Sequence, residues 1–193
     1  PRVGLGHIAR ILALAGGLRE AGLAPRVVTR AEDPRVLAHI AAAGFSTAPL
    51  PAAAGWEADA EATGAEIRRT GARAVVLDLG TDDAGRDPAA YPSYLSRLKD
   101  TGAVLLAFDD LDRLPGGADI VVNPNVGAGE GLPAPAGEAL RLDGPRYFPC
   151  LPRLAEVGRR REIRPRASRV LVTLGGGDPL ALTARVLRAL AGV

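Results

Sequence analysis

The chain of 193 residues contains a single cysteine, Cys150, and two histidines. One cysteine excludes an internal disulfide, and no cysteines and histidines stand at the spacing of zinc ligands. Cys150 lies between Pro149 and Pro152 with no histidine close in sequence, so we expect a buried structural thiol rather than a nucleophile. A disulfide-stapled secreted scaffold and a metal site are therefore not predicted, and the composition fits a reducing cytoplasm.

The sequence also lacks long hydrophobic runs, an initiator methionine and a strong excess of charge. Arg, Asp or Gly interrupts every apolar run well before the roughly 20 residues that span a bilayer, and no signal peptide opens the chain. Lys and Arg number 24 against 22 Asp and Glu, a net charge of +2, which argues against nucleic-acid binding. We expect a soluble, cytoplasmic protein. The arginines of 159–166 are read as a solvated linker or as an anion-attracting hinge.

What the sequence does have is an alternation of helix-period segments with short β-branched runs, and hydrophobic residues make up 47% of it. This pattern predicts an α/β fold with a mainly parallel, Rossmann-like sheet and flanking helices. Helices are predicted at 7–21, 34–43, 56–70 and 88–101, and strands at 25–30, 74–78, 103–108, 118–122 and 169–174, with an extended piece at 45–50 and a surface loop at 127–137.

The length allows one complete domain and a fragment. We expect an N-terminal domain over 1–165 and, over 166–193, the first βα unit of an incomplete second domain. Gly4 begins a glycine loop with no strand before it, although such a loop normally leaves a sheet, so we also expect a leading strand to be missing. Gly22, Gly44 and Gly71 stand where left-handed helix ends are predicted.

Two glycine loops precede predicted helices, at Gly4-Leu5-Gly6 and at Gly175-Gly176-Gly177. Free N–H groups and the dipole at a helix start attract anions such as a diphosphate, although glycines also close many ordinary βα turns. Neither loop matches the dinucleotide fingerprint G-x-G-x-x-G, and no Walker lysine follows either one. Both loops are candidate phosphate cradles, and no nicotinamide cofactor is predicted.

Candidate polar groups follow the glycine loop and the predicted strands. His7 opens a helix, where it is a capping group or, with an ordinary pKa near 6.5, a proton acceptor. Acids follow two strands, where open α/β sheets place ligand-binding groups: Asp78 after one, and Asp109 and Asp110 after another. Asn123 and Asn125 follow a third strand. The alternative for these side chains is local turn capping.

Taken in order, these motifs resemble a known family. They are Gly4-x-Gly6-His7-x-x-Arg10, Asp78, Phe108-Asp109-Asp110-Leu111, Asp119-Ile120-Val121-Val122-Asn123-Pro124-Asn125, Gly144-Pro145-x-Tyr147 and Leu174-Gly175-Gly176-Gly177-Asp178-Pro179-x-x-x-Thr183. The chain is similar to the PseG-like nucleotide-sugar hydrolases and the spore-coat SpsG proteins, and more distantly to MurG-type GT-B glycosyltransferases.

The resemblance implies a GT-B architecture in which water attacks the anomeric carbon of a UDP-sugar and UDP leaves. It implies His7 as the general base. It implies substrate contacts for Gly4, Gly6, Arg10, Asp78, Asp109, Asp110 and Asn125, and nucleotide contacts for Gly175, Gly176, Gly177, Asp178 and Thr183. Neither a cofactor nor a metal is implied.

The resemblance also has departures. Asp78 is followed by Leu79 and Gly80, where the hydrolases have histidine and tyrosine, and Gly177 stands where they usually carry serine. Two alternatives therefore stay open beside a hydrolase of a nucleotide-sugar: a GT-B glycosyltransferase of cell-surface polysaccharide synthesis, and a non-catalytic binding module. The sequence identifies neither the sugar nor the oligomeric state.

Overall fold

The computed structural model describes residues 6–50, 55–79, 87–111, 116–130, 139–159, 162, 165–166, 169–174, 178 and 180–191. The chain forms two compact units. One contains residues 24–149, and the other combines residues 1–23 with residues 150–193. We describe each unit by itself, and the domain boundary expected near residue 165 stays a prediction.

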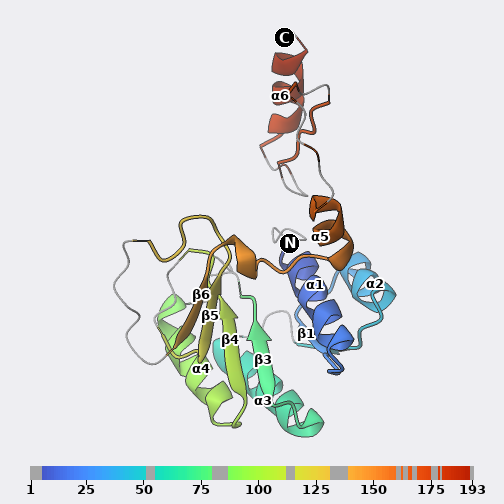
Figure 1. Cartoon of the computed structure of the whole chain (residues 1–193). Coiled ribbons are helices and arrows are strands. Elements are labelled where there is room, and N and C mark those ends of the chain that lie inside the picture. Colours follow the sequence, from blue (N-terminus) through green and yellow to red (C-terminus); the bar gives the residue numbers. More distant parts are fainter. Residues whose placement is uncertain are drawn as a thin grey trace. The chain divides into compact units, whose positions relative to one another are not determined.

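Unit 24–149 contains a four-stranded parallel sheet in the order β3-β4-β5-β6 (Figure 1). Its strands are β3 (Ala74–Leu77), β4 (Val104–Phe108), β5 (Ile120–Asn123) and β6 (Leu140–Asp143). A separate parallel pair is formed by β1 (Val27–Thr29) and β2 (Thr47–Pro49). The predicted α/β fold with parallel strands is thereby confirmed.

The helices of this unit begin and end at the expected local signals. They are α2 (Pro34–Ala42), α3 (Trp56–Thr70), the 3-10 turn η1 (Pro88–Ala90), α4 (Tyr91–Lys99) and the 3-10 turn η2 (Pro145–Tyr147). Asp33 caps α2, because its Oδ1 accepts the backbone N–H of Arg35 at 2.9 Å. Gly71 ends α3 in the left-handed conformation that its missing Cβ permits, with φ at 66°.

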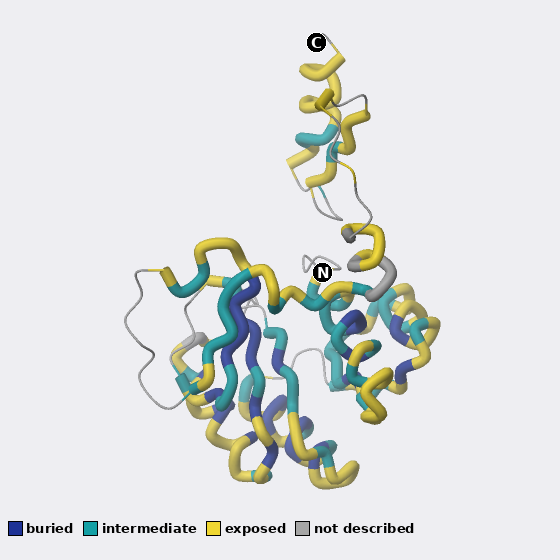
Figure 2. The backbone as a smooth tube through the Cα atoms, viewed as in Figure 1, coloured by how far each residue is buried: buried dark blue, intermediate teal, exposed yellow. Residues whose placement is uncertain are grey.

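The core of the unit lies between α4 and the four-stranded sheet, where the buried stretches are concentrated (Figure 2). Leu95 and Leu98 of α4 and Leu105 of β4 have no exposed surface. Their burial stabilises the packing of α4 against this sheet. Gly117 packs tightly against Leu95, since a Cβ at this glycine would lie 3.1 Å from Cδ1 of the leucine.

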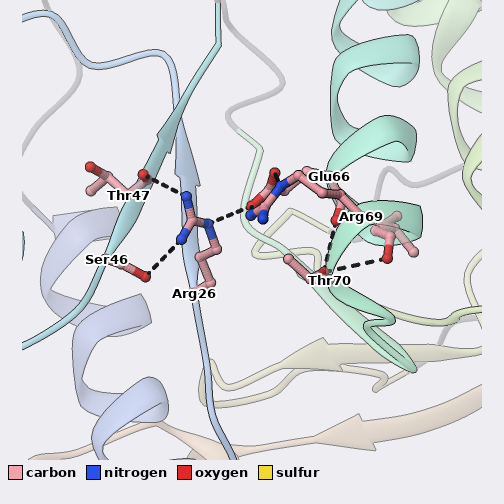
Figure 3. A network of polar contacts seen from close by, with 7 residues as sticks. Arg26, Ser46, Thr47, Glu66, Arg69 and Thr70 are labelled. Carbon is pink, nitrogen blue, oxygen red and sulfur yellow. Dashed lines mark hydrogen bonds and ion pairs between the residues drawn. The ribbon is translucent and has the colours of Figure 1, made fainter.

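Two ion pairs connect the β1-β2 pair to α3. Arg26, just before β1, pairs with Glu66 of α3, and its guanidinium also donates to Ser46 Oγ and to the carbonyl of Thr47, each at 3.1 Å (Figure 3). Arg30, just after β1, has its Nε 3.7 Å from Oδ2 of the buried Asp59. Because Arg26 meets the later residue of α3 and Arg30 the earlier one, β1 runs antiparallel to this helix.

Unit 1–23 with 150–193 contains α1 (Gly6–Glu20), α5 (Pro152–Arg159) and α6 (Leu182–Leu190). The helix predicted at 7–21 is confirmed, and Gly22 follows it with a positive φ of 85°. The strand predicted at 169–174 is wrong, since these residues form no regular structure and Leu171 is 87% exposed. A strand needs a neighbouring backbone, and no described strand pairs with this stretch. Cys150 is exposed, so its expected burial is also wrong.

Candidate functional site

The carboxyl ends of the four-stranded sheet carry a row of polar side chains, which we call the carboxyl-edge row. Because all four strands are parallel, these ends lie along one edge of the sheet. The row consists of Asp78 after β3, Asp109 and Asp110 after β4, Asn123 at the end of β5 with Asn125 two residues later, and Asp143 at the end of β6. Ligands of open α/β sheets bind at this edge.

Asn123 and Asn125 connect the loops that follow β4 and β5. The Oδ1 of Asn123 accepts the backbone N–H of Asn125 at 3.2 Å and its side-chain Nδ2 at 3.0 Å. The same Nδ2 donates to the carbonyl of Asp110 at 3.0 Å. Asn123 is 2% exposed, so its amide is part of the framework. Asn125 is exposed and already donates both Nδ2 hydrogens, which leaves its Oδ1 to contact a ligand.

Asp109 lies at the base of the row and is 5% exposed. Its backbone N–H donates to the carbonyl of Val122 at 3.0 Å, which extends the pairing of β4 and β5 beyond Phe108. Burial, and then the negative charge of Asp109, raise the pKa of Tyr91 well above its ordinary value of 10.0. Tyr91 is itself buried, in the first turn of α4.

Tyr91 and Asp143 belong to the edge although the sequence did not predict them. Tyr91 is the first residue of α4, the helix that follows β3. This place at the start of a helix after a strand is the sequence signal that could have identified it as a residue of this edge. Asp143 ends β6, a strand of four residues in which leucine alternates with a polar residue, and this alternation was the signal that could have found it. Arg141 donates to both carboxylate oxygens of Asp143 at 2.9 Å, from Nε and Nη2, in a bidentate pair. Gly129 covers this carboxylate, because a Cβ on it would lie 2.6 Å from Oδ2.

Asp119 belongs to the opposite edge of the sheet. Its Oδ2 accepts the backbone N–H of Leu105 at 2.8 Å, and its Oδ1 lies 2.9 Å from Nζ of Lys99. These contacts, the bond from Leu105 first, hold the pKa of Asp119 below its usual value. Asp119, one of the residues that carry the family resemblance, therefore has a structural role: it connects β4, β5 and the end of α4.

In the other unit, His7 and Arg10 face each other in the first turn of α1. The Nη2 of Arg10 lies 3.4 Å from Nδ1 of His7, and both side chains are half-buried. A guanidinium only donates hydrogen bonds, so Nδ1 is the acceptor in this contact. The neutral imidazole then carries its proton on Nε2. Gly6 is exposed at the start of the same helix.

Asp178 and Thr183 meet at the start of α6. The two carboxylate oxygens of Asp178 accept the backbone N–H groups of Leu182 and Thr183 at 2.9 and 3.0 Å. The side chain of Thr183 and these two N–H groups hold the pKa of Asp178 below its usual value. Asp178 and Thr183, both expected to contact the nucleotide, thus lie together. The anion bound at the start of this helix is the carboxylate of Asp178. Gly4 and Gly175 to Gly177 lie outside the described residues.

A hollow of about 190 Å³ opens between the beginning of α3 and α4. Its lining includes Trp56, Tyr94 and Ser93, and the ion pair of Glu57 with Arg97 at 2.7 Å lies beside it. Trp56 packs against Tyr91 and Tyr94 with ring centroids 5.2 and 5.0 Å apart. The indole N–H donates to the carbonyl of Asp87 at 2.9 Å. The hollow is a groove between helices and contains none of the predicted site residues.

Neither a metal centre nor a membrane span is found in the part of the chain that the structure describes. No group of three or more His, Cys, Asp or Glu residues there is placed to hold a metal ion. No described helix combines the length and the hydropathy that crossing a bilayer requires.

Comparison with known proteins leaves the family of the chain unassigned. No family model, curated protein or solved structure matches it.

Proposed function

We propose that this protein binds a nucleotide-activated sugar and hydrolyses it at the anomeric carbon, releasing UDP. The observation that carries the proposal is the carboxyl-edge row, in which parallel strands end in carboxylates and amides at the edge where α/β folds bind ligands. The family resemblance of the ordered motifs, and with it a GT-B architecture of two Rossmann-like domains, belongs to the same proposal.

The charge of the carboxyl-edge row favours a sugar over a phosphate. It contains four carboxylates, those of Asp78, Asp109, Asp110 and Asp143, and the guanidinium of Arg141 donates to both carboxylate oxygens of Asp143. Carboxylates accept hydrogen bonds from hydroxyl groups and repel anions. We therefore assign the sugar hydroxyls to this row, with the half-buried Asp110 and the exposed Asn125, through its Oδ1, as the contacts.

The diphosphate is assigned to the start of α6. The N–H groups of Leu182 and Thr183 already bind a pair of anionic oxygens, those of Asp178, at 2.9 and 3.0 Å. Two diphosphate oxygens make the same contacts if the half-buried carboxylate of Asp178 swings away. We assign to Gly175, Gly176 and Gly177, which precede this helix in the chain, further contacts to the diphosphate through their backbone N–H groups.

His7 is assigned the proton transfer. The oxygen of a water molecule attacks the anomeric carbon, the bond from this carbon to the diphosphate oxygen breaks, UDP leaves with the electron pair, and His7 takes the proton of the water. The lone pair of neutral His7 lies on Nδ1, where Arg10 donates. Arg10 must therefore turn to an anionic group of the ligand before His7 acts, which couples the base to substrate binding.

The test is incubation of the protein with UDP-sugars in the absence of an acceptor. We expect release of free sugar and UDP, and a loss of about a hundredfold or more in His7→Ala. The matched control is His39→Ala, which removes the other histidine from an exposed position on α2 and should keep the activity. Sugar release only when an acceptor is added would replace hydrolysis with glycosyl transfer. UDP-sugar binding without turnover, unchanged by His7→Ala, would leave a binding module.

A further inference from the structure

The turn that follows β6 carries two aromatic side chains that have no part in the proposed reaction. Asp143 ends β6, and the 3-10 turn η2 begins after a single residue, Gly144. The N–H of Gly144 donates to the carbonyl of Asn123 at 2.9 Å, and its φ of 98° is a positive value that glycine adopts at little cost. The turn therefore starts at the end of β5, beside the carboxyl-edge row.

Two backbone hydrogen bonds hold this turn together. The N–H of Tyr147 donates to the carbonyl of Gly144, and the N–H of Phe148 donates to the carbonyl of Pro145, each at 3.1 Å. Bonds between residues three apart are the pattern of a 3-10 turn, and the ring of Pro145 fixes one of its φ angles. The backbone that carries both aromatic rings is thereby constrained close to the ends of β5 and β6.

The two rings differ in how far they are available to a ligand. The guanidinium carbon of Arg146 lies 4.7 Å from the centroid of the Tyr147 ring, and this cation–π contact takes up one face of the phenol. Tyr147 is also half-buried. Phe148 is 57% exposed, although phenylalanine is among the residue types most often buried. Phe148 is therefore the aromatic side chain that this turn presents at the surface.

We propose that Phe148 belongs to the substrate site and stacks against the apolar face of the sugar's pyranose ring. This role rests on the proposed function, which places the sugar at the carboxyl-edge row. A pyranose has hydroxyl groups around its rim and C–H groups on its faces. Carboxylates accept hydrogen bonds from the hydroxyl groups, and the negative face of an aromatic ring attracts the C–H groups. The row and the ring beside it thus match both kinds of sugar surface, as in small-molecule sites that combine aromatic walls with a few polar groups.

The experiment measures binding of UDP-glucose, UDP-galactose and UDP by titration calorimetry. The whole protein carries His7→Ala throughout, so that the sugars are not hydrolysed during the titration. We expect Phe148→Ala to weaken the binding of at least one of the two UDP-sugars by about tenfold and to leave the binding of UDP unchanged. Phe148→Tyr should restore the affinity because it keeps the ring. Phe148→Leu should not, because it keeps only the apolar bulk.

Leu140→Ala is the matched control. Leu140 lies at the opposite end of β6 and is 56% exposed, nearly the same fraction as Phe148, so its truncation should leave all three affinities unchanged. The proposal is overturned if neither UDP-sugar binds, if Phe148→Ala binds both as tightly as the parent, or if Phe148→Leu restores the affinity. An equal loss of UDP affinity would assign the ring to the nucleobase and would also overturn it.

The outcome is separable from that of the hydrolase test. Sugar binding that depends on the ring of Phe148, without release of free sugar by the protein that retains His7, would refute hydrolysis and leave the stacking role standing. Sugar release that is unchanged in Phe148→Ala, together with unchanged binding, would refute the stacking role alone.

Discussion

At the scale of single residues, the polar side chains at the carboxyl edge are of two kinds. Some hold the edge in shape through contacts with one another, and others are available to contact a ligand. Asn123 is 2% exposed, and its Oδ1 is used by Asn125. Arg141 and Asp143 satisfy each other, and Gly129 closes over their pair. The fine shape of the edge thus depends on side chains that would not themselves touch a ligand.

Gly129→Ala tests this packing. The new Cβ would lie 2.6 Å from Oδ2 of Asp143, and φ at 77° is unfavourable for alanine. We expect the free energy of unfolding to fall by about 2 to 3 kcal/mol in thermal or urea unfolding. Gly127→Ala is the matched control, with φ at 78° but its nearest neighbour, Glu130, 3.8 Å away, and should cost about 1 to 2 kcal/mol. Equal losses in both variants would show that Asp143 moves aside freely.

At the scale of elements, α4 combines the hydrophobic core with a buried polar contact. Tyr94 donates to Oδ1 of Asp59 at 3.2 Å, and Thr63 donates to the same oxygen at 3.1 Å. Burial first, and then the charge of Asp59, raise the pKa of Tyr94 above its ordinary value of 10.0. Helices α3 and α4 are therefore joined by a carboxylate that needs neutral phenol and hydroxyl donors.

This raised pKa predicts how stability depends on alkaline pH. Above about pH 10 the unfolded chain loses the Tyr94 proton while the folded chain keeps it, so the free energy of unfolding falls as pH rises. The expected slope is about 1.4 kcal/mol per pH unit for this tyrosine. Urea unfolding between pH 8 and 11 on the protein and on Tyr94→Phe measures it. An unchanged slope in Tyr94→Phe would contradict the raised pKa.

At the scale of the whole molecule, the protein consists of two compact units, and one of them holds both parallel sheets. Within unit 24–149 the fully buried leucines of α4 and β4 form the center of one continuous core. A cavity at this center should therefore weaken the sheet as a whole rather than one strand.

Leu95→Ala tests this cooperativity. Leu95 has no exposed surface, so truncation leaves a cavity and should lower the free energy of unfolding by about 2 to 5 kcal/mol. We expect the protected amides of β4 and β5 to exchange faster together. Leu140→Ala on β6, where the leucine is 56% exposed, is the control and should cost less than about 1 kcal/mol. Faster exchange confined to α4 would contradict a single core.

The sequence by itself determined the local elements and the composition of the candidate site. Apolar spacing, capping residues and glycines act within a few residues, so α1, α2, α3 and the strands β1, β3, β4 and β5 could be predicted with close bounds. It also placed Asp78, Asp109, Asp110 and Asn125 after strand ends. Strand β6 was missed because its alternation of leucine with polar residues covers only four residues after a segment rich in Gly, Pro and Ala. Helix α5 was not separated from the arginine-rich linker expected at 159–166.

Only the tertiary structure decided which of these groups meet. The pairing of β5 with β6, the bond from Asn125 to the carbonyl of Asp110, and the binding of the α6 N–H groups by Asp178 depend on backbone geometry that sequence spacing does not contain. The failed strand at 169–174 has the same reason. A β-branched run has strand propensity, but a strand forms only where a neighbouring backbone accepts its hydrogen bonds.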